Sequence, residues 1–100
     1  MGAQGSATID FGAFPGKTDA SVAVTGQTSI LSGSLVEAWV SPVATSDHSA
    51  DEHVFESMRV IAGNVVAGTG FTIYAVKLGD LLGTDQNFLY GQWTVNWCWN

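Results

Sequence analysis

Basic residues are scarce in this sequence. The only cations are Lys17, Arg59 and Lys77, set against nine acidic residues for a formal net charge of −6. Nucleic-acid binding requires a basic patch that neutralises phosphates, and three scattered cations cannot form one. Nucleic acid is therefore excluded as an expected partner. The same acidity argues against binding to a negatively charged membrane surface.

Cysteine is also scarce, and long apolar runs are absent. Cys98 is the only cysteine, so no disulfide can form within the chain. No apolar run is long enough to cross a bilayer and no secretory signal is recognisable, so we expect no membrane insertion. Synthesis in a reducing cytoplasm is the simplest expectation.

Helix-forming patterns are rare, whereas strand and turn residues are abundant. The 100 residues include 12 glycines, and only 12% of the residues are charged, about half the usual share. This length is typical of one domain. We therefore expect a single domain over residues 1–100, with residues 1–6 as an extended arm.

Alternation with a period of two residues dominates the rest of the chain, which is typical of half-buried strands. Turn residues separate the alternating segments, and these lie at 7–11, 20–25, 34–41, 53–66, 71–76 and 90–100. Residues 52–61 also fit a helix, but their β-branched and aromatic residues favour a strand. Residues 78–87 are predicted to form a loop. The pattern predicts an all-β, six-stranded antiparallel sandwich.

The last segment carries three of the four tryptophans. Trp93, Val95, Trp97 and Trp99 fall on one face of the predicted strand. Each indole can bury on the order of 200 Å², and three on one face exceed what the core of so small a sandwich needs. We therefore predict that part of this face forms an interface with another copy of the chain.

The stretch "SDHSADEH" (46–53) holds the only cluster of metal-ligand residues. His48, His53 and Asp51 are candidate ligands for zinc or manganese. The spacing matches neither HExxH nor HxxEH, however. A solvated polar loop explains the same residues, and both interpretations stay open.

A second candidate site lies on the segment 34–41. Glu37 and Trp39 share one face there, where an indole can stack on a sugar ring and a carboxylate can accept its hydroxyl groups. A partly solvated sheet surface explains the same pair. No G-x-S-x-G nucleophile motif and no acid–base pair are present. We therefore expect neither an enzyme nor a cofactor.

Four motifs resemble a small family of bacteriophage structural proteins: "TIDFG" (8–12), "DASVAVTGQ" (19–27), "AGTGFTIYA" (67–75) and the tryptophan-rich end (91–100). The match covers nearly the whole chain. More weakly, the order of strands resembles the H-type lectin domain, a six-stranded antiparallel sandwich that trimerises and binds sugars at subunit borders. The paired cysteines of the secreted lectins are missing here.

These resemblances imply a non-enzymatic virion protein made in the cytoplasm of a host bacterium. It would form trimers on the particle surface as a head decoration, a fibre or a tail-tip module. Its expected partners are copies of itself, other virion structural proteins and host surface glycans. The alternative implied by the second resemblance is a lectin-like module that recognises sugars at subunit borders.

Overall fold

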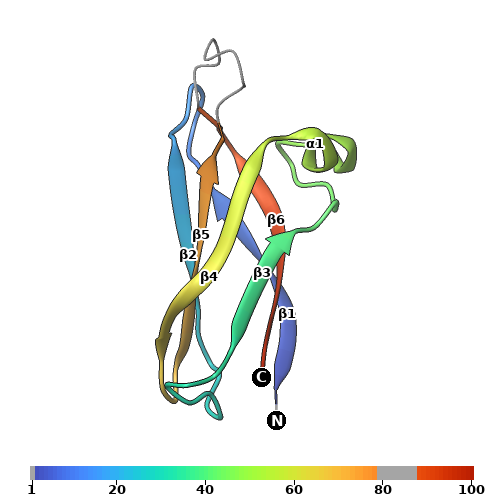
Figure 1. Cartoon of the computed structure of the whole chain (residues 1–100). Helices are drawn as coiled ribbons and strands as arrows, with labels where there is room; N and C mark the ends of the chain where they lie inside the picture. The colour runs from blue at the N-terminus through green and yellow to red at the C-terminus, as the bar shows by residue number, and fades with distance from the viewer. Residues whose placement is uncertain (1, 79–87) are drawn as a thin grey trace.

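The computed structural model describes residues 2–78 and 88–100 (Figure 1). Six strands and one short helix follow each other along the chain: β1 (Ala3–Asp10), β2 (Asp19–Val24), β3 (Val36–Val40), α1 (Ala50–Phe55), β4 (Met58–Val66), β5 (Gly70–Lys77) and β6 (Gln92–Trp99). The predicted loop at 78–87 lies outside the described residues, apart from Leu78. Among the described residues, no helix has the length and apolar character needed to span a membrane.

The strands form two antiparallel sheets of three strands each, in the orders β1–β6–β3 and β2–β5–β4. The sheets pack face to face, with β1 against β2 and β3 against β4 (Figure 1). The predicted all-β fold with six antiparallel strands is thus confirmed.

Strand β6 is the centre of its sheet. Trp99, next to the carboxyl end of the chain, pairs with Ala3 on β1 and with Val36 on β3. Two further backbone hydrogen bonds join Asn100 to Leu35, at 2.9 and 3.0 Å. Hydrogen bonding on both edges holds the tryptophan-rich end in the sheet, where a terminal strand at an edge would fray.

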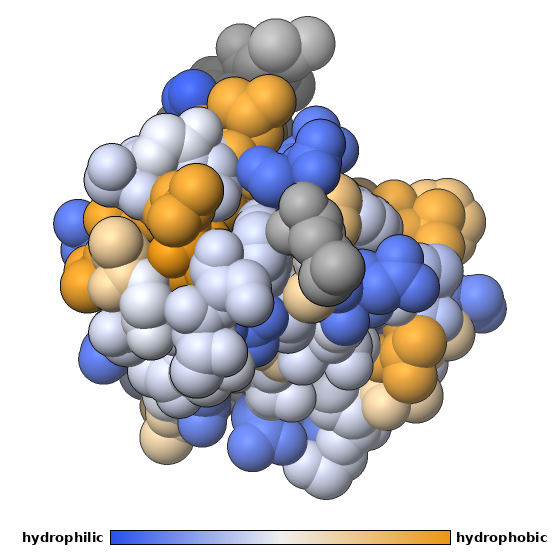
Figure 2. All heavy atoms as spheres, turned by 90° about the horizontal axis from the view of Figure 1, so that it is seen from below, coloured by the Kyte–Doolittle hydropathy of each residue, from blue (hydrophilic) through white to orange (hydrophobic). Residues whose placement is uncertain are grey.

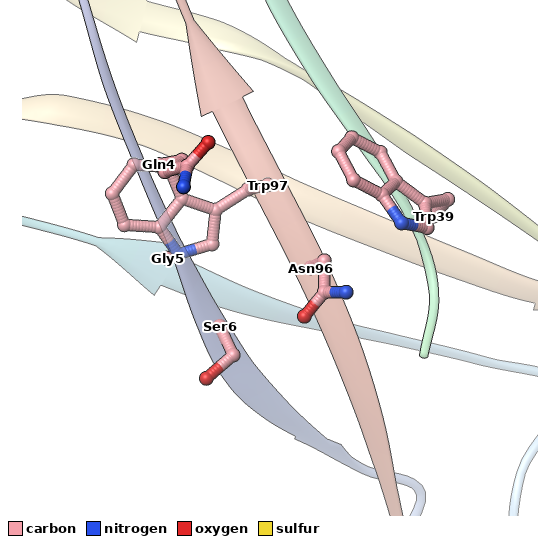
Figure 3. A pocket seen from close by; sticks show the side chains of 6 residues that line it. All are labelled: Gln4, Gly5, Ser6, Trp39, Asn96 and Trp97. Carbon is pink, nitrogen blue, oxygen red and sulfur yellow. The ribbon is translucent and has the colours of Figure 1, made fainter. Parts of the chain in front are cut away.

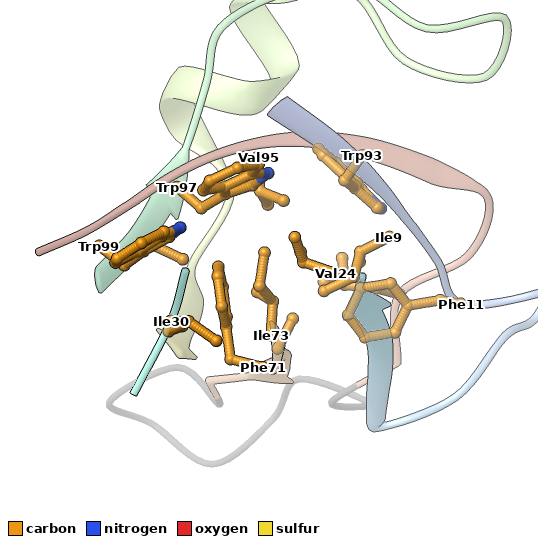
Figure 4. Packing of buried hydrophobic residues seen from close by; sticks show 13 residues of the cluster. Ile9, Phe11, Val24, Ile30, Phe71, Ile73, Trp93, Val95, Trp97 and Trp99 are labelled. Atoms are coloured by element: carbon orange, nitrogen blue, oxygen red, sulfur yellow. The ribbon is translucent and has the colours of Figure 1, made fainter. Parts of the chain in front are cut away.

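The tryptophan face of β6 lies inside the sandwich (Figure 4). The side chains of Trp93, Val95, Trp97 and Trp99 are only 1%, 0%, 8% and 6% exposed. They pack against the inward face of the opposite sheet; Phe71, for example, meets the Trp97 ring edge-on at 5.5 Å. The prediction that this face forms an interface with another copy is therefore wrong, because the chain buries these side chains in its own core.

One glycine makes room for so large a set of indoles. A Cβ atom at Gly5 would lie 2.6 Å from Cζ2 of Trp97, closer than any real contact. The Trp97 ring therefore lies over the bare backbone of β1, and the sheet accommodates the indole without a second copy.

Residues 3–6 are not an arm. All of β1 from Ala3 pairs in register with β6, with Gln4 opposite Cys98 and Ser6 opposite Asn96. The prediction of an extended arm over residues 1–6 is therefore wrong for residues 3–6, which form the edge of the sheet.

The predicted strand at 53–66 begins only at Met58, because helix α1 occupies Ala50–Phe55. Ser49 caps this helix: its hydroxyl accepts the Glu52 N–H, and the Glu52 carboxylate accepts the Ser49 N–H. This capping box satisfies free N–H groups at the start of the helix and favours the helix over a strand.

The start of β1 and the end of β6 lie at the same end of the sandwich (Figure 1). Figure 2 shows this end with most of its surface hydrophilic or near neutral, and with apolar side chains in small separate patches. Isolated patches of this kind are ordinary on a protein surface. The two outer sheet faces are more distinctive.

Candidate functional site

The outer face of the β1–β6–β3 sheet is polar. Because side chains alternate along β6, burial of its tryptophans turns Gln92, Thr94, Asn96 and Cys98 outward. The register places Asn96 between Ser6 on β1 and Trp39 on β3. In the next row Cys98 lies between Gln4 and Glu37.

Trp39 lies beside a shallow depression of about 470 Å³ in this face (Figure 3). The lining residues come from three strands: Gln4, Gly5, Ser6, Trp39, Asn96 and Trp97. Trp39 is 43% exposed, whereas the other three tryptophans are at most 8% exposed. Among the described residues of β1, β6 and β3, it is the only large apolar side chain that is exposed.

Polar groups around the depression are free to meet a ligand. Within the described residues, the side chains of Gln4, Ser6, Trp39 and Asn96 make no hydrogen bond to the protein. Thr94, one row away, differs: its hydroxyl donates to the Val43 carbonyl at 2.9 Å. The structure therefore confirms that Glu37 and Trp39 share an exposed face, and it adds Asn96, Ser6 and Gln4 to them.

The outer face of the β2–β5–β4 sheet is more apolar. Its central row consists of Ser21, Tyr74 and Ile61, in register across the three strands. Tyr74 and Ile61 are 42% and 44% exposed. Val76, also 42% exposed, extends the apolar strip along β5. These three side chains are contiguous, and contiguous exposed apolar side chains can mark a surface that another protein covers.

Opposite charges flank this apolar strip. Val76 lies between Asp19 on β2 and Arg59 on β4, in one row across the sheet. Both flanking side chains are exposed. Within residues 2–78 and 88–100, Arg59 forms no ion pair, whereas Lys77 on β5 pairs with Glu56. The face thus carries an acid along one edge and a base along the other.

The two histidines of the predicted metal site are buried beside Trp93. His48 lies parallel to the indole and His53 meets it edge-on, with ring centroids at 3.8 and 4.9 Å. Each histidine is only 4% exposed. Asp51 lies in the first turn of α1 and is exposed.

All four ring nitrogens of this pair are engaged within the chain. His48 contacts the Glu52 carboxylate through Nδ1 (2.8 Å) and the Tyr90 carbonyl through Nε2 (2.6 Å). His53 donates from Nδ1 to the Ser49 carbonyl (2.7 Å) and accepts the Thr94 N–H at Nε2 (3.0 Å). No group of three metal-ligand residues occurs in the described part of the chain. The described residues therefore do not form the predicted metal site, because each ring nitrogen already contacts a polar group of the chain.

These contacts stabilise the charged form of the Glu52 carboxylate. Its carboxylate accepts the Ser49 N–H and lies against His48, and these hydrogen bonds, with the charge of the histidine, hold its pKa below the usual value. The contacts of the two histidines hold neighbouring segments of the chain together. They fasten α1 to β6 at the point where β3 ends.

Searches among protein-family models, curated proteins and solved structures found no match. A functional assignment must therefore come from the sequence motifs and from the two exposed sheet faces.

Proposed function

We propose that this protein is a non-enzymatic bacteriophage virion structural protein that assembles as a trimer on the particle surface. The motif resemblance over nearly the whole chain supports the virion assignment. The apolar outer face of the β2–β5–β4 sheet, with Asp19 and Arg59 at its edges, is the observation that carries the proposal of assembly.

The opposite charges at the two edges of this face fit an assembly of copies with rotational symmetry. When copies surround an axis parallel to the strands with this face toward the axis, the β2 edge of one copy adjoins the β4 edge of the next. Asp19 and Arg59 share a row, so the carboxylate of one copy would meet the guanidinium of its neighbour at the same height. The tyrosine and isoleucine of the central row would then be buried near the axis. Burial of apolar side chains would supply most of the affinity between copies. The ion pairs would fix how neighbouring copies align.

The proposed place of the protein is the virion, as a head decoration, fibre or tail-tip module made in the host bacterial cytoplasm. Other virion structural proteins are the expected neighbours. Host attachment through surface glycans is a further proposed role.

A second candidate function is that of a carbohydrate-binding module, which the resemblance to H-type lectins implies at subunit borders. The exposure of Trp39, beside polar side chains that have no hydrogen-bond partner among the described residues, favours the sugar-binding part of this alternative.

The oligomeric mass tests the main proposal. Size-exclusion chromatography with light scattering is expected to give three times the chain mass for the wild type. Tyr74→Ser, which makes the centre of the apolar face polar, is expected to shift the protein to the single-chain mass. Trp39→Ser is the matched control on the opposite sheet and should leave the trimer intact. A wild type that stays single at high concentration would contradict assembly, and absence of the chain from purified virions would contradict the virion assignment.

A further inference from the structure

The exposure of Trp39 is not explained by the fold or by the proposed assembly. Its indole lies on the outer face of β1–β6–β3, on the opposite side of the sandwich from Tyr74 and Ile61. The other three indoles are buried in the core, so the core of this chain does accommodate tryptophan side chains. One isolated indole among polar side chains does not make a protein–protein interface, which has a continuous apolar centre.

The surroundings of the indole narrow the class of ligand. Two carboxamides and one hydroxyl, from Asn96, Gln4 and Ser6, line the same depression and have no hydrogen-bond partner among the described residues. A carboxamide both donates and accepts hydrogen bonds, which matches neighbouring hydroxyl groups on one ligand. An aromatic face attracts a ligand surface of C–H groups. Sugar rings combine both kinds of surface.

The charges of the chain disfavour anionic ligands at this depression. No lysine or arginine lines the depression, and the chain carries a net charge of −6. A phosphate, a sulfated sugar or a sialic acid would find no cation there. Glu37, exposed in the adjacent row beside Cys98, adds an acceptor for a hydroxyl group.

Distances between strands set the size of the ligand. Neighbouring strands lie about 4.8 Å apart, so the row from Trp39 through Asn96 to Ser6 spans roughly 10 Å. One sugar ring stacked on the indole would reach Asn96, and a second ring would be needed to reach Ser6, because these residues follow one another across the sheet. A volume of about 470 Å³ lies within the range of small-molecule sites.

We infer that the depression beside Trp39 binds a neutral saccharide of at least two pyranose rings. One ring stacks on the indole, and the Asn96 amide and Ser6 hydroxyl bond to hydroxyl groups of the next. All of these residues belong to one chain, so the site is complete without a subunit border. The inference rests on the second candidate function, sugar binding, and does not depend on the proposed trimer.

Nuclear magnetic resonance titration of the full chain tests the site. Cellobiose, maltose, lactose and chitobiose serve as probes, each up to about 50 mM, which detects dissociation constants in the millimolar range. At least one disaccharide is expected to shift the indole N–H signal of Trp39 and the side-chain amide signals of Asn96. The indole N–H groups of Trp93 and Trp99 are held by Tyr90 and Gln27 and should not shift. If no probe moves the Trp39 signal, the inference is overturned.

Variants show whether the indole itself binds. Trp39→Ala and Asn96→Ala are each expected to raise the dissociation constant at least about tenfold. Trp39→Tyr keeps an aromatic face and should stay within a few-fold of the wild type. Tyr74→Ser, which alters an exposed aromatic residue on the other sheet, is the matched control. It should bind the disaccharide as the wild type does even when it is a single chain. Unchanged binding in Trp39→Ala would overturn the inference, and loss of binding in Tyr74→Ser would contradict a site that is complete within one chain.

Discussion

The imidazole of His48 lies against the indole of Trp93, with ring centroids 3.8 Å apart and planes inclined by 19°. Trp93 in turn donates its indole N–H to the Tyr90 carbonyl at 3.1 Å, the same oxygen that the Nε2 atom of His48 contacts. One stack therefore joins the loop before α1 to the central strand of the sheet. The residues that the sequence offers as metal ligands act here as part of the core.

His48→Ala is expected to lower the free energy of unfolding by about 2–4 kcal/mol. The change removes the stack on Trp93 and leaves a buried space beside the indole. Urea unfolding followed by tryptophan fluorescence measures the loss. Val54→Ala, at an exposed position of α1, is the control and should change stability by less than about 0.5 kcal/mol. Equal stability of His48→Ala and the wild type would show that the stack is not structural.

Zinc is expected to leave thermal stability unchanged. All ring nitrogens of His48 and His53 already hold hydrogen bonds within the chain, so a metal ion would have to break them. Differential scanning fluorimetry with added Zn²⁺ or EDTA measures this. A rise in melting temperature with Zn²⁺ that disappears in His53→Ala would restore the metal site.

Glu52→Gln is expected to destabilise the protein at neutral pH and to have little effect in acid. Folding lowers the pKa of Glu52 below its usual 4.5, so its charged form stabilises the folded state. That contribution is complete above pH 4.5 and is lost as the pH falls through the lower pKa of the folded state. Thermal unfolding of both proteins across this range measures the difference. Glutamine still fits a capping box, so the variant isolates the charge. A difference between the two proteins that does not change with pH would contradict the ionic role.

Gly5→Ala is expected to cost about 1–3 kcal/mol of stability, because the new methyl group would overlap the Trp97 ring. Gly33→Ala is the matched control, since a Cβ atom there meets nothing within 4 Å. Urea unfolding of the two variants gives the comparison. Equal stabilities would mean that the Trp97 ring is free to move away from β1.

Alternation along the chain predicted the strands and the inward face of β6, because burial of one face requires a period of two residues. The prediction that this face forms an interface was wrong. What covers a buried face is decided by the residues that lie opposite it, and alternation does not specify these. Gly5 and Phe71, far away in the sequence, provide the space and the partner for Trp97. The helix carried a local signal, since Ser49 and Glu52 form the spacing of a capping box.

Only part of the candidate sugar site could be predicted from the sequence. Glu37 and Trp39 are two residues apart on one strand, so their common face follows from alternation. Asn96 and Ser6 join them through the register of β6 with its neighbours, which no local pattern specifies. The apolar face of the other sheet was missed for the same reason, because Ile61 and Tyr74 become neighbours only when β4 pairs with β5.

The oligomeric mass of a charge-swap series tests the central proposal most directly. Asp19→Arg and Arg59→Asp, made singly, place like charges at the proposed contact, and light scattering should show each variant as a single chain. The double variant restores opposite charges with the partners exchanged and should return to the mass of the trimer. Single variants that stay trimeric, or a double variant that stays a single chain, would contradict assembly through the β2–β5–β4 face.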